Sequence, residues 1–121
     1  MRGEGIDGIS DGIVKGGVSP HTFANKPEVV AFVRELLTRQ PVEGYARSCE
    51  AMGASVAADI SKIKCPLLVI AGRDDAVSPV ANGEGIVAEL PHARLVIIEQ
   101  CGHWHPIEQP AEVTQALAGF L

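Results

Sequence analysis

Two loops of the sequence carry acidic and imidazole side chains that could act together in catalysis. The first loop follows a short apolar run and contains Asp74 and Asp75, and the second follows another apolar run and contains His103 and His105. A carboxylate that accepts a hydrogen bond from one ring nitrogen of a histidine fixes its tautomer and leaves the other nitrogen free to act as a general base. These loops therefore predict an acid–base pair of the kind that serves hydrolysis.

Simpler roles exist for the same residues. An aspartate in a turn commonly caps its own backbone, and a lone loop histidine is usually a hydrogen-bonded surface residue. Cys101, His103 and His105, with Asp75 nearby, could also form a zinc site, but their alternation is tighter than the usual ligand spacings. The pairing of Asp75 with a Gly-His loop favours the acid–base interpretation, and we expect neither a metal nor a cofactor.

The elements around these loops alternate between strand and helix. Leu67 to Ala71 and Ala93 to Glu99 are apolar runs of strand length, typical of parallel strands covered on both faces. Ser78 and Pro79 predict the N-cap and first turn of a helix between them, and a last helix follows Pro110. This order predicts a right-handed βαβ crossover, whose strand ends bring both loops to one crevice.

The first half of the chain has helical periodicity. Apolar spacing predicts helices around Ile6 to Val14, from Pro27 to Leu37 and from about Val42 to Met52. Its aromatic residues are interpreted mainly as core. Four aromatic residues are also candidates for lining a substrate cavity: Phe23, Phe32 and Tyr45 in this half, and Trp104 beside His103.

Composition narrows the functional classes. The chain has 121 residues, 46% hydrophobic and 21% charged, which fits one globular domain or part of one. Ten basic against fifteen acidic residues, a net charge of -5, argue against nucleic-acid binding. The apolar runs are too short to span a membrane, no leader is indicated, and three unpaired cysteines favour a reducing compartment, so we expect a cytoplasmic protein.

A family resemblance rests on the second half of the chain. The matching residues are Cys65-Pro66-Leu67-Leu68-Val69-Ile70-Ala71-Gly72 with Asp75 and Pro79, then Gly102-His103 with Glu108 and Pro110. They resemble the carboxyl-terminal end of the α/β-hydrolase family. In that family the acid lies three residues past the glycine that ends its strand, which selects Asp75 over Asp74. The base follows a glycine, which selects His103 over His105, while Glu108 is expected to orient the entry to the last helix.

The upstream helices are similar to the cap of 3-oxoadipate enol-lactonase-like hydrolases. The similarity lies in Pro27-Glu28-Val29-Val30, Leu36-Leu37, Glu43-Gly44-Tyr45-Ala46 and Cys49-Glu50-Ala51. The resemblance implies the carboxyl-terminal βαβα portion of an α/β-hydrolase fold at residues 58–121, preceded by a helical cap segment at residues 1–57. It also implies a small carboxylic ester or enol-lactone as substrate.

The family's nucleophile elbow, G-x-S-x-G between a strand and a helix, has no match of suitable context. Gly8-Ile9-Ser10-Asp11-Gly12 fits the letters, but helical spacing runs through it and no apolar strand precedes it. We therefore expect the nucleophile, whether Ser, Asp or Cys, to be absent from this chain, which would then be inactive alone. The alternative is a non-catalytic remnant or interaction module. In either case the exposed strand edges predict a homodimer or pairing with a missing N-terminal half.

Overall fold

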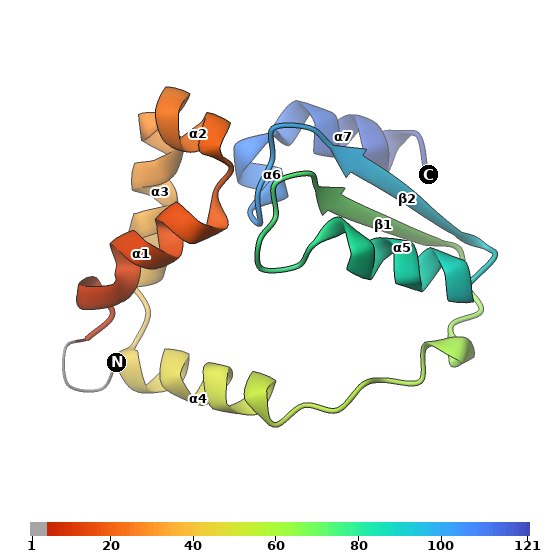
Figure 1. The fold of residues 1–121 in the computed structure, drawn as a ribbon, viewed down its shortest axis with the longest axis horizontal. Helices are drawn as coiled ribbons and strands as arrows, with labels where there is room; N and C mark the ends of the chain where they lie inside the picture. The colour runs from red at the N-terminus through yellow and green to blue at the C-terminus, as the bar shows by residue number, and fades with distance from the viewer. Residues whose placement is uncertain (1–4) are drawn as a thin grey trace.

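The computed structural model describes residues 5–121, with a group of helices at one end and a small α/β unit at the other (Figure 1). The helical group consists of α1 (Asp7–Gly17), α2 (Pro20–Asn25), α3 (Pro27–Thr38) and α4 (Val42–Gly53). The three predicted helices are confirmed, but α2 was not predicted from periodicity. It forms because the Ser19 hydroxyl accepts a hydrogen bond from the Thr22 N–H and Pro20 occupies the first turn.

One apolar cluster holds the helical group together. Its buried members are Ile6, Val14, Val18, Val33 and Leu37, which come from α1, the segments at its ends and α3. Trp104 and Ile107, from beyond the second strand, pack against the same cluster. The helical group is therefore anchored to the α/β unit through side chains next to His103.

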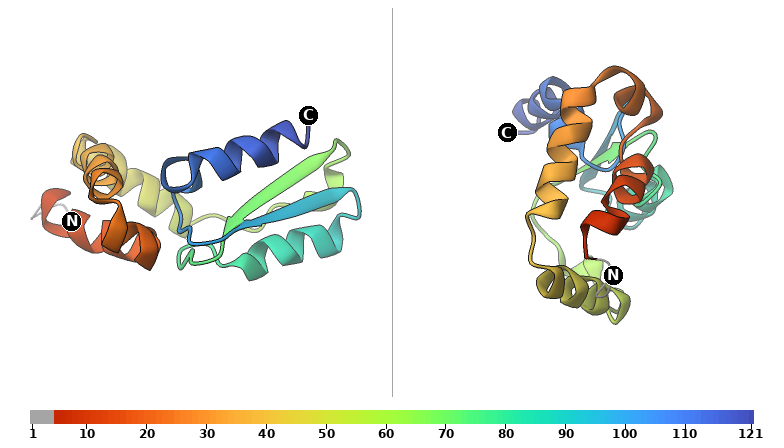
Figure 2. Two further views of the ribbon diagram at one scale, coloured as in Figure 1. Left: turned by 90° about the horizontal axis from the view of Figure 1, so that it is seen from above. Right: turned by 90° about the vertical axis from the view of Figure 1, so that its left-hand side faces the viewer.

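The α/β unit contains a two-stranded parallel sheet. β1 (Leu67–Gly72) pairs with β2 (Ala93–Ile98) in a register that runs from Leu67 opposite Ala93 to Gly72 opposite Ile98. α5 (Val80–Glu89) and α7 (Pro110–Ala118) lie on opposite faces of the sheet (Figure 2). This arrangement confirms the predicted strand–helix–strand–helix order.

Alternation along the strands explains why each face receives one helix. Val69 and Leu95 face Gly83 of α5, whereas Ile70 and Val96 pack with Val113 of α7. Most residues of β1 are nevertheless only half-buried. The part of the chain that the structure describes has two strands, so each strand keeps one unpaired edge. The full burial predicted for β1 is therefore not reached with these residues alone.

Three local features differ from the prediction. β2 ends at Ile98, one residue earlier than expected, and a short helix, α6 (His105–Glu108), lies in what was interpreted as a loop. Ser78 does not cap α5, which begins at Val80 with Pro79 at the N-cap position and no side-chain cap bond. The connection from α4 to β1 is largely exposed and contains one 3₁₀ turn, η1 (Ile60–Lys62). No helix within residues 5–121 is long and apolar enough to cross a membrane.

Candidate active site

Asp75 and His103 form a hydrogen-bonded pair at the carboxyl ends of the two strands. The His103 Nδ1 lies 3.0 Å from the Asp75 Oδ2. The Asp75 side chain is 1% exposed and the imidazole is 40% exposed. Backbone N–H groups of Val77 and Ser78 donate to the other carboxylate oxygen at 2.9 and 2.8 Å. The same Asp that the resemblance selected thus meets the selected His.

The protonation state of the pair follows from these contacts. Burial raises the pKa of Asp75, but the hydrogen bonds from Ser78, His103 and Val77 outweigh it and the net pKa lies below the ordinary value. The carboxylate is therefore ionised at neutral pH and can only accept hydrogen bonds. The His103 Nδ1 must carry the proton of this bond, which leaves Nε2 as the nitrogen that can take a proton from another group.

Close backbone approach sets the distance between the two loops. The Asp74 N–H donates to the Cys101 carbonyl at 2.9 Å. A Cβ on Gly72 would overlap the carbonyl oxygens of Cys101 and Gly102. Glycine at the end of β1 is thus required for the second loop to pass directly over the first. Asp74 takes part in this contact through its backbone, and the residue is otherwise exposed.

A third segment, the carboxyl-terminal end of α1, completes the support of the second loop. The His103 N–H donates to the Gly17 carbonyl at 2.6 Å. A Cβ on Gly102 would overlap the same carbonyl, and a Cβ on Gly17 would overlap the Trp104 ring. The helical group therefore packs directly against the backbone that carries the imidazole.

The second imidazole, that of His105, occupies a different environment. Its Nε2 lies 3.7 Å from the Asp75 Oδ2 and is buried without a hydrogen-bond partner. Burial lowers the pKa of His105, and the approach of His103 lowers it further, while Asp75 and Glu108 act in the opposite direction. The net lowering keeps the His105 ring neutral at neutral pH, and the hydrogen bond to Asp75 comes from His103.

A cavity of about 190 Å³ adjoins the pair. Its walls come from β1 and α5, including Val69, Ala71 and Ile86, and its polar side chains include Asp75 and His103. Apolar walls around a few convergent polar groups are typical of small-molecule sites. No residue of β2 lines this cavity.

Of the predicted substrate-contacting residues, the structure brings only Trp104 next to the pair. Its ring lies edge-on to the His103 imidazole, with the centroids 5.7 Å apart. Phe23 lines a separate cavity on α1–α3, Phe32 is 51% exposed, and Tyr45 packs against the helical cluster. None of the four, Trp104 included, lines the cavity beside Asp75.

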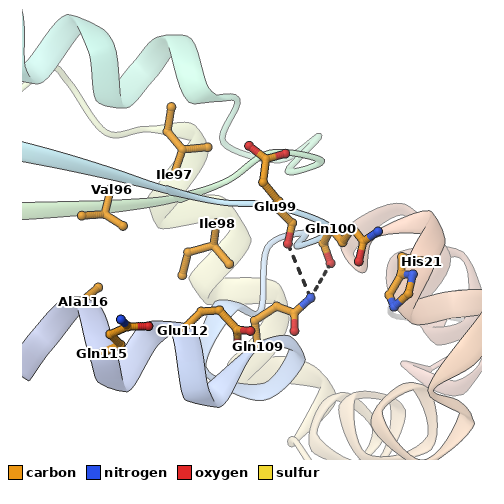
Figure 3. A pocket seen from close by; sticks show the side chains of 10 residues that line it. All are labelled: His21, Val96, Ile97, Ile98, Glu99, Gln100, Gln109, Glu112, Gln115 and Ala116. Atoms are coloured by element: carbon orange, nitrogen blue, oxygen red, sulfur yellow. Dashed lines mark hydrogen bonds between the residues drawn. The ribbon is translucent and has the colours of Figure 1, made fainter.

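A larger groove, of about 540 Å³, lies between β2 and α7 (Figure 3). Val96 and Ile98 point toward α7, and the Gln109 amide crosses the end of the groove to donate to the Gln100 carbonyl at 3.0 Å. Neither Asp75 nor His103 lines it. The larger groove is therefore separate from the Asp75–His103 pair, and the smaller cavity beside that pair is the candidate site.

The metal-site interpretation finds no support among residues 5–121, where no group of three His, Cys, Asp or Glu side chains is placed to hold an ion. Cys101 is fully buried, and burial is the main cause that raises its pKa to about 12. It therefore remains a protonated thiol at neutral pH.

Ser10 of the G-x-S-x-G match lies inside α1 and is fully buried. Its hydroxyl donates to the Asp7 carbonyl at 3.0 Å, a bond within the helix. A nucleophile elbow instead places its side chain at a sharp turn between a strand and a helix. The helical context predicted for this segment is confirmed.

Glu108 is the residue whose role the sequence understated. Instead of only orienting the last helix, its carboxylate is fully buried and accepts hydrogen bonds from three backbone N–H groups. The available signal was an acidic residue five positions after His103, shortly before Pro110. Its partners, which include Ser19, could not be read from local spacing.

Comparisons with known proteins show the family of this chain. Residues 4–116 match the model of the alpha/beta hydrolase family. A 3-oxoadipate enol-lactonase from Acinetobacter baylyi is 31% identical over 122 aligned residues, which cover 100% of this chain and 45% of that protein. A thermophilic esterase from Thermogutta terrifontis superimposes with a TM-score of 0.87 and 33% identity, covering 98% of this chain and 44% of the esterase.

An enol-lactonase from Burkholderia xenovorans superimposes with a TM-score of 0.85 and 29% identity, covering 98% of this chain and 46% of that protein. The chain thus spans less than half the length of these relatives. The match to the family model extends over nearly all of its residues. The chain belongs to the α/β-hydrolase family.

Proposed function

We propose that this chain supplies the acid, Asp75, and the base, His103, of a hydrolase acting on small carboxylic esters or enol-lactones. The observation that carries the proposal is the 3.0 Å contact between His103 Nδ1 and an ionised, buried carboxylate. Similarity to an enol-lactonase and to an esterase supports the substrate class.

In this mechanism the His103 Nε2 accepts the proton of a nucleophile as the nucleophile attacks the ester carbonyl. The imidazolium then donates that proton to the leaving oxygen, and in the second half-reaction the same nitrogen activates water. Asp75 holds the ring in the required tautomer and stabilises its positive charge. Trp104, edge-on to the ring, limits its rotation.

We place the nucleophile outside residues 1–121, with serine as the expected type. The buried, helical position of Ser10 supports this assignment. In this scheme residues 1–57 serve as the cap, residues 58–121 complete the core, and the nucleophile-bearing half pairs with the unpaired edge of β1. The apolar cavity between β1 and α5 then becomes part of the enclosed site.

A chimera tests the proposal. In this chimera, the segment of the Acinetobacter baylyi enol-lactonase that matches this chain is replaced by this chain, and the amino-terminal part of the enol-lactonase is kept. Hydrolysis of an activated ester by the chimera is then measured. We expect turnover, its loss in Asp75→Asn and His103→Ala, and its retention in the matched control Asp74→Asn, whose residue is exposed. Turnover that survives both Asp75→Asn and His103→Ala would contradict the proposed roles.

The unmodified chain supplies a second test. A serine-directed fluorophosphonate probe should leave it unlabelled and an activated ester should remain intact, because residues 1–121 supply only acid and base in this scheme. Labelling at Ser10 with turnover would overturn the placement of the nucleophile.

The unpaired edges of β1 and β2 favour a second candidate, a non-catalytic module that associates with itself. Light scattering on the purified chain, together with the chimera, separates the two. A stable dimer whose chimera folds but has no turnover would favour the interaction module.

A further inference from the structure

Glu108 presents a buried carboxylate at the end of α6 that the proposed reaction does not use. The residue is 0% exposed. A carboxylate removed from water is destabilised unless hydrogen bonds replace its hydration. Here Oε2 accepts from the N–H groups of Ser19 at 2.8 Å and Gly102 at 3.1 Å, and Oε1 accepts from that of Trp104 at 3.2 Å.

Two of these three donors are the immediate neighbours of His103. Glu108 binds the N–H before the histidine and the N–H after it, while the histidine's own N–H donates to the Gly17 carbonyl. The backbone orientation of Gly102, His103 and Trp104 is therefore held by three separate bonds. Fixing this backbone fixes the direction in which the His103 side chain projects from it. The position of the imidazole relative to Asp75 depends on that direction.

The third donor belongs to the helical group. Ser19 is the N-cap residue of α2, and its hydroxyl also donates to the Gln100 carbonyl at 2.9 Å. The Lys26 Nζ adds a second connection, donating to the backbone carbonyl of Glu108 at 2.6 Å and to the Gln109 side-chain oxygen at 3.1 Å. One side chain, that of Glu108, thus connects the loop of the base with the start of α2.

We propose that Glu108 is a positioning residue for His103, and that its carboxylate couples the orientation of the base to the docking of helices α1–α3 on the α/β unit. Catalytic use of that orientation rests on the proposed function. The structural coupling itself is measurable in the 121-residue chain without any turnover.

The first test uses the unmodified chain. Because the N–H groups of Ser19, Gly102 and Trp104 share one acceptor carboxylate, they should exchange with solvent through a common opening. Amide hydrogen exchange measured by NMR should give the three a closely similar protection factor. Three unrelated factors, with Gly102 and Trp104 unprotected, would overturn the proposal.

The second test is Glu108→Gln, with the exposed Glu112→Gln of α7 as the matched control. Glutamine has the shape of glutamate but turns an N–H₂ group toward at least one backbone N–H. We expect the NMR signal of the His103 Nδ1 proton to weaken or disappear in Glu108→Gln. A lower stability alone would leave this signal unchanged as long as the chain stays folded. Circular dichroism identifies conditions in which both variants are folded.

The fluorescence of Trp104, the single tryptophan, provides an independent readout. Its emission should shift to longer wavelength in Glu108→Gln and remain unchanged in Glu112→Gln. A His103 Nδ1 signal that remains intact in folded Glu108→Gln overturns the positioning role. The chimera tests the proposed function separately, because its turnover can depend on Asp75 and His103 whether or not Glu108 orients them.

Discussion

Asp75→Asn tests the chemistry of the pair most directly. Asparagine can keep its side-chain oxygen where the N–H groups of Val77 and Ser78 need an acceptor. Its N–H₂ group then faces the His103 Nδ1, which must become an acceptor. The ring is forced into the tautomer with the proton on Nε2, and that nitrogen can no longer accept one.

The expected magnitudes follow from burial and distance. Loss of the charged acceptor should lower the free energy of unfolding by about 1–2 kcal/mol, since charge-assisted hydrogen bonds are about twice as strong as neutral ones. In the enclosed site of the chimera, a carboxylate and an imidazolium with charge centres about 4 Å apart attract by about 4 kcal/mol at an effective dielectric constant of about 20. Losing this stabilisation corresponds to about 10³-fold in kcat.

The assay is nitrogen-15 NMR of the histidine rings, which distinguishes the two neutral tautomers. The signals of His103 should change from a protonated Nδ1 to a protonated Nε2 in Asp75→Asn and stay unchanged in Asp74→Asn. An unchanged His103 tautomer in folded Asp75→Asn would refute the reasoning, because it would mean that the carboxylate does not select the protonated nitrogen.

Two further predictions concern the support of the site. Gly17→Ala should destabilise the chain by about 1–3 kcal/mol and alter the emission of Trp104, because the new Cβ overlaps the indole ring. Gly16→Ala, which meets no atom within 4 Å, should be neutral or stabilising in the same denaturant titration, and equal losses would contradict the packing described. The pKa of His105 is lower in the folded chain than in the unfolded chain, so the unfolded chain binds more protons than the folded chain as the pH falls below about 6.5. The free energy of unfolding should therefore decrease in that range, by at most about 1.4 kcal/mol per pH unit for one site. His105→Gln should flatten this part of the stability profile, and a profile identical to that of the unmodified chain would show that the burial of His105 is not its cause.

Local patterns were sufficient to predict the main elements and the loops that carry the pair. The apolar runs that became β1 and β2, and the helical spacing of α1, α3 and α4, depend on residues close together in the chain. The short helices α2 and α6 were missed because each is stabilised by a cap, a proline or packing rather than by an apolar stripe. Ser78 was wrongly expected to cap α5: the helix has Pro79 at its N-cap position, and the Ser78 hydroxyl accepts a hydrogen bond from the Asn82 side chain instead.

The candidate site also has features that local patterns predicted and features that they did not. Asp75 and His103 stand in recognisable positions after glycines that end or follow strands, so their meeting could be predicted. The placement of Phe23, Phe32 and Tyr45 away from the cavity could not, because it depends on how α1–α4 dock rather than on their periodicity.

By itself, the sequence determined the strand and helix order, the two loops that bring Asp75 and His103 together, and the helical context of Ser10. All of these follow from residue types and short-range spacing. Tertiary structure alone decided that Glu108 is a buried acceptor for both neighbours of His103. Its bond to Ser19 joins residues 89 positions apart, and a contact over that distance arises from the docking of whole elements, for which no local pattern codes.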